Sequence, residues 1–307
     1  MSDNSKIEWT DATWNVITGC SIESPGCRDC YAMTLAGTRL RNHWSRIGLT
    51  QPSAGGPVWT GEVRFNEPWL HQPLNWKRSR MIFVVAHGDL FHANVPFETI
   101  DRIFAVMALS PQHKFQVLTK RTARMAEYFA SPGREALIGQ QVSQLHLQRK
   151  GSPVSEWSGL PMPNVLLGTS VENQRYADLR RAPMAELAAA GWATWVSYEP
   201  ALDLVNWAGW EFLSWLVAGG ESGATARPSL PGWYRAARDF CAAAGIPYLF
   251  KQWGTFCTKD QMPEATFMKV HAPDNAAGQD HADRTLNVGK KASGRLLDGI
   301  EHNGFPS

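Results

Sequence analysis

The sequence predicts an α/β fold built on a partial or full parallel (β/α) barrel of about six to seven strands. Two observations lead to this prediction. Short apolar runs alternate with segments of helical spacing from about residue 81 to residue 254. Within the runs, apolar residues do not alternate with polar ones, which is typical of parallel strands buried on both faces. Such alternation indicates βαβ units with right-handed crossovers, and a doubly wound open sheet remains the alternative.

Each expected strand is a run of apolar residues that ends in polar ones. The six runs are 81–92, 114–121, 164–173, 194–200, 212–223 and 246–254, and WNVITGC (14–20) is a further strand or loop ahead of them. Helical spacing predicts helices at 97–111, 122–131, 175–191 and 231–245. Polar residues at the carboxyl ends of parallel strands converge on one mouth of a barrel, where such folds place their chemistry.

Two stretches interrupt this pattern. Residues 41–60 include the loop QPSAGGP, and residues 131–163 are rich in Gln, Ser, Gly and Pro. The stretch 131–163 is longer than most loops that connect elements of a compact domain, and it therefore predicts a lid, an insertion or a mobile segment. We therefore expect a barrel domain over 1–254 with insertions near 41–60 and 131–163, and a C-terminal extension over 255–307 that folds over the barrel mouth.

Composition narrows the class of protein. With 44% hydrophobic and 19% charged residues, the 307-residue chain has the composition of a soluble globular protein. No apolar run is long enough for a membrane span, and the N-terminus lacks the basic and apolar regions of a secretory signal. Five cysteines, three of them clustered, fit a disulfide framework poorly, so we expect a cytoplasmic protein. The net charge of +2 does not by itself indicate nucleic-acid binding.

The clustered cysteines are the strongest functional signal. Cys20, Cys27 and Cys30 have the spacing C-x6-C-x2-C, with Gly19, Pro25 and Gly26 supplying turn-forming residues. One interpretation is a structural zinc site, whose fourth ligand would come from elsewhere. The candidate fourth ligands are His43, His87 and His92. The other interpretation is an iron–sulfur cluster, since three thiolates on a cubane leave one iron open for a ligand.

The second interpretation is the arrangement of radical S-adenosylmethionine (SAM) enzymes, in which SAM occupies the open iron position. The common spacing in those enzymes is C-x3-C-x2-C. The final C-x2-C of this chain agrees with it, whereas the first gap is three residues longer. A Gly- and Pro-containing loop after the first strand of a parallel barrel is where such a cysteine loop is expected.

Motifs along the whole chain resemble a family. They are KIEWTDATWNVITGC, SPGCRDCYA, RFNEPWLHQPLNWK, DLFHANVP, FQVLTKR, LLGTSVEN, VSYEPAL, VAGGESG, FKQWG and KKASGRLLDG. The sequence is similar to a phage- and bacterium-encoded three-cysteine family of unknown function that is radical-SAM-like. The resemblance covers nearly all of the chain except parts of 38–60, 131–163 and 258–285. It implies that the three cysteines bind a [4Fe–4S] cluster and that the strand-end motifs surround SAM and the substrate.

Candidate site residues follow from these motifs. Those that could bind the cofactor SAM are Ser170, Glu172, Asn173, Glu199, Gly219, Gly220 and Glu221, and the catalytic candidates are Asp89, Lys120, Glu199 and Lys251. A strand-end cap or a local salt bridge is an equal alternative for any single polar member, and a bend with close backbone approach is the alternative for the glycines. Cys241 is expected in the core. Cys257 is a fourth ligand, a radical-accessible thiol or a spectator, and Trp253 is a base-stacking or a buried residue.

We therefore expect a radical SAM enzyme that generates a 5′-deoxyadenosyl radical and takes electrons from an external donor. Its substrate is unidentified, and the phage association together with basic, Trp-containing strand ends favours a nucleobase or nucleic acid, for repair or modification. The alternative is a zinc-stabilised nucleic-acid-binding protein without radical chemistry. A hydrolase that uses Asp89, Glu172 and Glu199 around a divalent metal would leave the cysteines unexplained.

Overall fold

The structure is a computed structural model that describes residues 5–148, 157–262 and 284–306. The chain divides into two units. Unit 1 comprises Met1–Thr169 and Ala182–Thr194, and unit 2 comprises Ser170–Arg181 and Trp195–Ser307. Within the described residues, none of the helices combines the length and the apolar character needed to cross a membrane.

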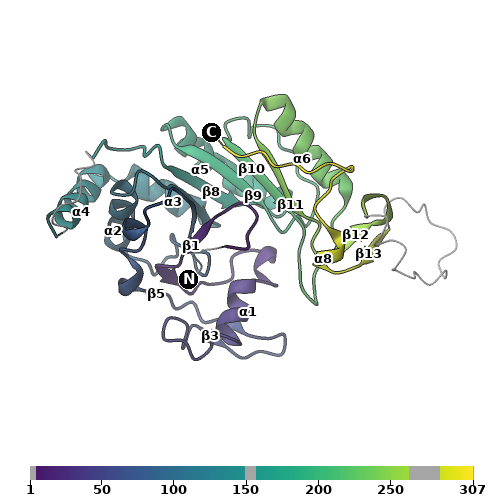
Figure 1. The fold of residues 1–307 in the computed structure, drawn as a ribbon, viewed down its shortest axis with the longest axis horizontal. Coiled ribbons are helices and arrows are strands. Elements are labelled where there is room, and N and C mark those ends of the chain that lie inside the picture. The colour runs from purple at the N-terminus through teal and green to yellow at the C-terminus, as the bar shows by residue number, and fades with distance from the viewer. Residues whose placement is uncertain (1–4, 149–156, 263–283, 307) are drawn as a thin grey trace. The chain divides into compact units, whose positions relative to one another are not determined.

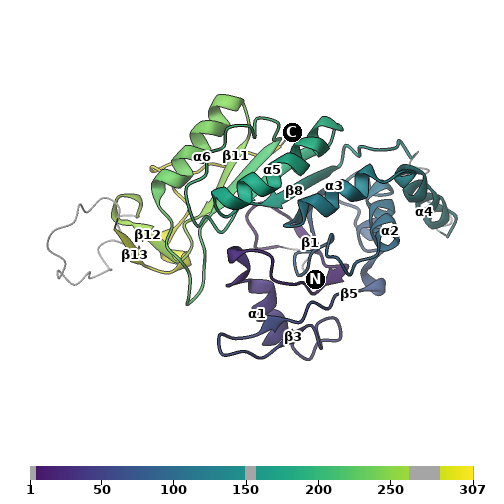
Figure 2. The same cartoon turned by 180° about the vertical axis from the view of Figure 1, so that it is seen from behind.

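A seven-stranded sheet runs through the chain (Figures 1 and 2) in the order β1-β6-β7-β8-β9-β10-β11. Its strands are β1 (Ala12–Trp14), β6 (Met81–Val84), β7 (Lys114–Thr119), β8 (Val165–Ser170), β9 (Ala193–Tyr198), β10 (Trp215–Gly219) and β11 (Tyr248–Gln252). The strands pair in parallel within unit 1, from β1 through β6 and β7 to β8, and within unit 2, from β9 through β10 to β11. The order follows the chain without a reversal, and β1 and β11 form the two edges. The sheet is therefore singly wound and open, which confirms the predicted α/β fold in its partial-barrel form.

The strands form where the sequence places apolar runs. All six residues of β8 and all five of β10 are buried, and β9 is buried from its second residue onward. Burial on both faces requires the continuous apolar runs from which these strands were predicted. Each of the six expected runs contains one strand of the sheet. The segment 14–20 contributes the last residue of β1 and the short strand β2 (Ile17–Thr18).

Unit 1 carries three packed helices, α2 (Phe97–Ala108), α3 (Thr122–Ala130) and α4 (Arg134–Gln148). The first two were predicted, and α2 buries Ile100, Ile103, Phe104 and Met107 at helical spacing. Helix α4 lies within the stretch 131–163 that was expected to be an insertion, and it packs against α2 and α3. Residues 149–156 of the same stretch lie outside the described residues.

The N-terminal part of unit 1 consists of short elements. Strand β2 pairs antiparallel with β5 (Arg64–Phe65), and β3 (Thr50–Gln51) pairs with β4 (Val58–Trp59) inside the expected insertion 41–60. Between β2 and β3 lie the 3₁₀ turn η1 (Pro25–Cys27) and helix α1 (Tyr31–Gly37). Two further turns, η2 (Glu67–Trp69) and η3 (Pro73–Asn75), precede β6.

Unit 2 continues the alternation with α6 (Pro231–Ala244), which packs against β10 and β11 (Figure 1). Helix α5 (Gln174–Ala189) divides between the two units. After β11 come β12 (Phe256–Thr258), η4 (Lys259–Gln261), β13 (Thr285–Asn287) and α8 (Lys290–Ser293), with β12 and β13 antiparallel. The last segment returns to β11, since the N–H of Phe250 donates to the carbonyl of His302 at 3.0 Å. Residues 263–283 of the expected C-terminal extension lie outside the described part, and its placement over a mouth stays a prediction.

Candidate functional site

The three clustered cysteines lie in unit 1, between β2 and α1. Cys20 follows Gly19, Cys27 ends η1, and Cys30 is the residue that precedes α1. Two backbone hydrogen bonds form turns in this segment. The N–H of Cys27 donates to the carbonyl of Ser24 at 2.9 Å, and the N–H of Cys30 donates to the carbonyl of Cys27 at 3.3 Å. Gly19 has a φ of 96°, and a Cβ there would lie 2.2 Å from the carbonyl oxygen of Glu62, so only glycine fits. The sequence thus fixes the start of the cysteine segment.

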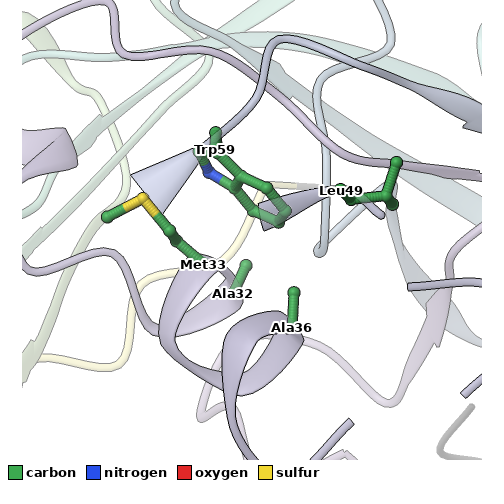
Figure 3. Close-up of a cluster of buried hydrophobic side chains, with 5 residues drawn as sticks. All are labelled: Ala32, Met33, Ala36, Leu49 and Trp59. Carbon is green, nitrogen blue, oxygen red and sulfur yellow. The ribbon is translucent and has the colours of Figure 1, made fainter. Parts of the chain in front are cut away.

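A small apolar cluster supports this segment. It consists of Ala32, Met33 and Ala36 of α1 together with Leu49 and Trp59 (Figure 3). In the close-up, Ala32 and Ala36 point from α1 toward Trp59. The partly buried side chains of Cys20 and Cys30 pack against the same cluster. Packing against the cluster that α1 forms with Leu49 and Trp59 therefore supports both cysteines, in addition to the turns.

The environment of the thiols opposes a free negative charge. Burial, assisted by the Asp89 carboxylate, raises the pKa of the Cys20 thiol to about 12, and Arg121 acts in the opposite direction. Burial also raises the pKa of the Cys30 thiol, whereas hydrogen bonds from the N–H groups of Met33 and Ala32, at the start of α1, lower it. The charge of Cys27 adds to both increases.

Metal-ligand geometry for a single ion is not found in the described ranges: no three or more His, Cys, Asp or Glu side chains are arranged to hold one. The three histidines considered as fourth zinc ligands have other polar contacts. These are His43 with Ser45 at 2.7 Å, His87 with Arg46 at 2.9 Å and His92 with Ser21 at 3.0 Å. The zinc interpretation therefore receives no specific support from the geometry.

Asp89 and Arg121 form a buried ion pair beside Cys20. The distance from Arg121 Nη1 to Asp89 Oδ2 is 2.6 Å, and their side chains are 11% and 6% exposed. Thr119, at the end of β7, donates to Asp89 Oδ1 at 2.7 Å. Arg121 Nη1 also donates to Cys20 Sγ at 3.7 Å, and Nη2 donates to Ser21 Oγ at 2.7 Å. The predicted residue Asp89 thus joins the cysteine segment through Arg121.

Lys120 lies between Thr119 and Arg121, directly after β7. The positive charge of Lys120 lowers the pKa of the Cys30 thiol, and this effect is smaller than those of burial, the N–H groups and Cys27. Two consecutive cations at one strand end therefore act on two different cysteines, Arg121 on Cys20 and Lys120 on Cys30.

In unit 2, Glu172 is fully enclosed. Its carboxylate pairs with Arg180 at 2.7 Å, and the two side chains are 0% and 3% exposed. Arg180 also donates to the carbonyl of Ser170 at 2.7 Å. Asn173 accepts the N–H of Tyr176 at 3.2 Å through Oδ1, which is a contact at the start of α5. These three predicted residues lie together at the end of β8, where Ser170 is its last residue and Glu172 and Asn173 follow it, and they have structural partners of their own.

The Gly-Gly-Glu segment, residues 219–221, begins with the last residue of β10. A Cβ on Gly220 would lie 1.8 Å from the carbonyl oxygen of Trp253, so this segment passes directly over the backbone after β11. This short distance is a close approach of two backbone segments, which is the alternative role expected of these glycines from the sequence. Glu221 is buried and accepts the N–H of Arg227 at 2.9 Å and its Nε at 2.8 Å.

Glu199 and Lys251 form a second, more open ion pair in unit 2. Lys251 Nζ donates to both carboxylate oxygens of Glu199, at 2.8 and 3.0 Å, and the side chains are 13% and 19% exposed. Gln252 Nε2 lies 3.4 Å from Glu199 Oε1 and 3.5 Å from the carbonyl of Gly220. Both neighbours are acceptors, which fixes the amide orientation. Gln252 Oε1 is then buried without a hydrogen-bond partner in the described part of the chain.

The remaining sequence expectations concern single residues. Cys241 is fully buried in α6, which confirms it as a core residue. Cys257 is fully buried in β12. Trp253 is 1% exposed and donates to the carbonyl of Leu296 at 2.8 Å, so the base-stacking interpretation of Trp253 is wrong. It packs against Tyr234 and Phe250 instead.

Several partners of the candidate residues were not predicted. They are Ser21, Arg180 and Arg227, each of which holds a predicted residue or its neighbour. Of the residues in these contacts, only Arg121 could be anticipated from the sequence, because it follows Lys120 at a predicted strand end. The other contacts join residues that no motif links.

Comparison with known proteins gives a family and a group of distantly similar solved structures. Among curated proteins, none matches the chain. One similar solved structure is spore photoproduct lyase complexed with dinucleoside spore photoproduct, at 14% identity and a TM-score of 0.41. A mutant of spore photoproduct lyase is similar at 13% identity and a TM-score of 0.40. Each match covers 71% of this chain and 58% of the other, so the chain spans 58% of the length of these structures. A family described as "Protein of unknown function (DUF5131)" matches residues 4–306, and the chain belongs to this family.

Proposed function

We propose that this protein is a radical SAM enzyme in which Cys20, Cys27 and Cys30 hold a [4Fe–4S] cluster. The observation that carries the proposal is the grouping of three buried or half-buried thiols on one turn-rich segment. Hydrogen-bonding groups surround these sulfurs: Arg121 donates to Cys20, the first N–H groups of α1 donate to Cys30, and the Ser24 hydroxyl, which can donate to a thiolate, lies 3.8 Å from the sulfur of Cys27.

The donor set fits such a cluster. Thiolates are the usual ligands of cubane clusters, and three of them leave one iron with an open position. In a cubane each cysteine binds a different iron, so the three sulfurs enclose a volume and need not converge on one point. Burial disfavours the thiolates when they are free, and iron supplies the compensating positive charge. N–H groups directed at the sulfurs are a common feature of these sites.

When bound, the cluster supplies the electron that cleaves SAM, and an external donor returns it. The residues of the chain provide position and charge. Asp89 and Thr119 orient Arg121 toward Cys20, and Lys120 adds a second positive charge.

In unit 2, the Glu199–Lys251 pair is the polar group best suited to bind part of SAM or of the substrate. It offers a carboxylate, an ammonium group and the unsatisfied amide oxygen of Gln252, and it is partly exposed. Ser170, Glu172, Asn173 and the segment Gly219–Glu221 were also proposed as SAM contacts. Since Glu172 and Glu221 are held by arginines, we assign them the role of shaping the strand ends around that pair.

For the substrate we propose a nucleobase or nucleic acid. Trp253 does not support this class, because it is buried. Trp44 supports a substrate of this class, because its side chain is 47% exposed. Arg39 and Arg41, nearby in the sequence, are exposed as well. An exposed aromatic ring with cations close to it in the sequence suits a stacked base and its phosphate.

The proposal is tested by anaerobic reconstitution with iron and sulfide. We expect about four irons and four sulfides per chain, and dithionite-dependent formation of 5′-deoxyadenosine from SAM. Cys27→Ala should abolish both. Cys241→Ala, which removes a buried thiol from α6, should leave both intact and is the matched control. A colourless protein with one zinc per chain and no SAM cleavage would instead support the zinc-stabilised nucleic-acid-binding alternative.

A further inference from the structure

We infer that Arg121 sets the reduction potential of the proposed cluster by donating a charged hydrogen bond to the sulfur of Cys20. The inference rests on the proposed function and adds a positioning and tuning residue to that site. It concerns the chain's own guanidinium group, whose contacts are all present in the structure.

The hydrogen-bond geometry of the guanidinium carries the inference. Arg121 Nη1 has two hydrogens and two neighbours, Asp89 Oδ2 at 2.6 Å and Cys20 Sγ at 3.7 Å. Arg121 Nη2 donates to Ser21 Oγ at 2.7 Å and lies 3.3 Å from Glu23 Oε2. The longer distance to sulfur suits the larger radius of that atom. The planar fork of arginine can make these contacts simultaneously, which a lysine cannot.

The guanidinium is also held in place. Its side chain is only 11% exposed, and its main anchor, Asp89, is 6% exposed and receives a further hydrogen bond from Thr119. A buried charge with fixed partners acts on its neighbours more strongly than an exposed and mobile one. The contact with Cys20 is therefore preorganised rather than formed when the metal arrives.

The sign of the effect follows from charge. One-electron reduction, for example by dithionite, adds one negative charge to the cluster and its three thiolates. A cation that donates to one of these sulfurs stabilises the reduced form more than the oxidised form, and so raises the reduction potential. The charge of Asp89 acts in the opposite direction and remains in place when Arg121 is replaced, so loss of the hydrogen bond from Arg121 to the sulfur still lowers the potential.

Potentiometric titration followed by electron paramagnetic resonance, without SAM, tests the inference. In Arg121→Gln we expect the equilibrium constant for reduction to fall about tenfold, the size expected for one lost charged hydrogen bond. This is a decrease of about 59 mV in the potential. Arg121→Lys, which keeps the charge, should recover part of the shift.

Arg124 provides the matched control. It lies three residues further along in α3 and donates to the carbonyl of Val95 at 2.9 Å. Arg124→Gln removes the same charge from the same region without a contact to a cysteine sulfur. We expect it to leave the potential unchanged. An equal shift in both variants would mean a general charge effect and would overturn the specific role of Arg121.

A measurement on the unmutated chain does not depend on how the variants fold. Protein grown with arginine that carries ¹⁵N only in the guanidino group should show a weakly coupled ¹⁵N nucleus in pulsed resonance spectra of the reduced cluster. Absence of this coupling would overturn the inference. If the unmutated chain takes up no iron and sulfide, the proposed function itself fails, and the inference fails with it. A normal cluster whose potential is unmoved in Arg121→Gln refutes the inference alone.

Discussion

Glu172 and Glu199 are both strand-end carboxylates with a cationic partner, but they differ in access to solvent. Glu172 and Arg180 are 0% and 3% exposed, whereas Glu199 and Lys251 are 19% and 13% exposed. A fully buried ion pair whose hydrogen bonds are satisfied has no hydrogen-bonding group left to bind a ligand. The Glu199 pair can exchange one partner for a ligand, and Gln252 Oε1 beside it has no hydrogen-bond partner among the residues that the structure describes.

This difference predicts opposite outcomes for the same substitution. Glu172→Gln leaves Arg180 buried without a counter-charge and should lower the free energy of unfolding by about 3–5 kcal/mol. Glu199→Gln should lower it by only about 1 kcal/mol, because its partner reaches water. Urea unfolding measures the first quantity, and calorimetric titration of the cluster-loaded protein with SAM measures binding. Loss of binding in Glu199→Gln with near-normal stability supports a ligand role, and unchanged SAM affinity and activity would contradict it.

At the scale of single residues, the sequence indicated the strand-end positions but not their partners. A carboxylate after a buried strand is visible as a polar residue that ends an apolar run. Whether it binds a ligand or an arginine depends on the side chains that packing brings to it. Arg180 reaches Glu172 from within α5, and Arg227 reaches Glu221 across a loop. Neither contact leaves a pattern in the sequence.

Among the elements, α4 is held to its neighbours by one buried polar network. Arg134, at the start of α4, contacts both oxygens of Asp101 in α2 at 2.9 Å. Tyr128 of α3 donates to Asp101 Oδ1 at 2.7 Å, and the guanidinium of Arg134 lies 4.5 Å from the centre of the Tyr128 ring. Each of the three helices contributes one member, so the network fixes their mutual packing.

Asp101→Asn should therefore destabilise the chain strongly. The substitution removes the counter-charge of Arg134, whose side chain is 8% exposed, and we expect a loss of about 3–5 kcal/mol in the free energy of unfolding. The neighbouring Arg102 provides the control, since it pairs with Glu67 at the surface. Glu67→Gln should cost less than about 1 kcal/mol. Equal losses in the two variants, measured by urea unfolding, would show that the network has no special role.

Elements were predictable where the hydrophobic pattern is regular. The six main strands and the helices α2, α3, α5 and α6 coincide with the predicted segments, because buried parallel strands and amphipathic helices require those patterns. Helix α4 was missed because the stretch 131–163 as a whole is rich in Gln, Ser, Gly and Pro, and because only Arg134, Ile138, Val142 and Leu145 of the fifteen residues of α4 are buried. The two-residue strands β3 and β4 are too short to produce a pattern at all.

For the whole molecule, spacing along the chain could not decide between an open doubly wound sheet and a barrel-type sheet. Both are built from right-handed βαβ units, and they differ in whether successive strands always extend the sheet in one direction. That direction depends on which face each helix packs against, which is a property of the assembled layers. The observed order settles the question in favour of the singly wound arrangement. The expected division into residues 1–254 and 255–307 stays a prediction.

Four histidines distributed over the molecule share one electrostatic property. Burial lowers the pKa of His87, His92, His113 and His302. For His87 the value is about 4, since burial and the charge of Arg46 both act against protonation. In the unfolded chain each histidine returns to its usual value of about 6.5. Between the two values the unfolded chain binds more protons than the folded one, so stability decreases as the pH falls.

The metal-free chain should therefore lose stability between about pH 6.5 and pH 4, before most carboxylates titrate. His87 alone should account for about 3 kcal/mol of that loss, and His87→Gln, which cannot gain a proton, should show a flatter dependence of the unfolding free energy on pH. His71→Gln is the control, because that side chain is exposed. Urea unfolding at a series of pH values measures the slopes. If the His87 variant keeps the slope of the unmutated chain, the proton uptake on unfolding arises elsewhere, and His87 is not held neutral by burial and Arg46.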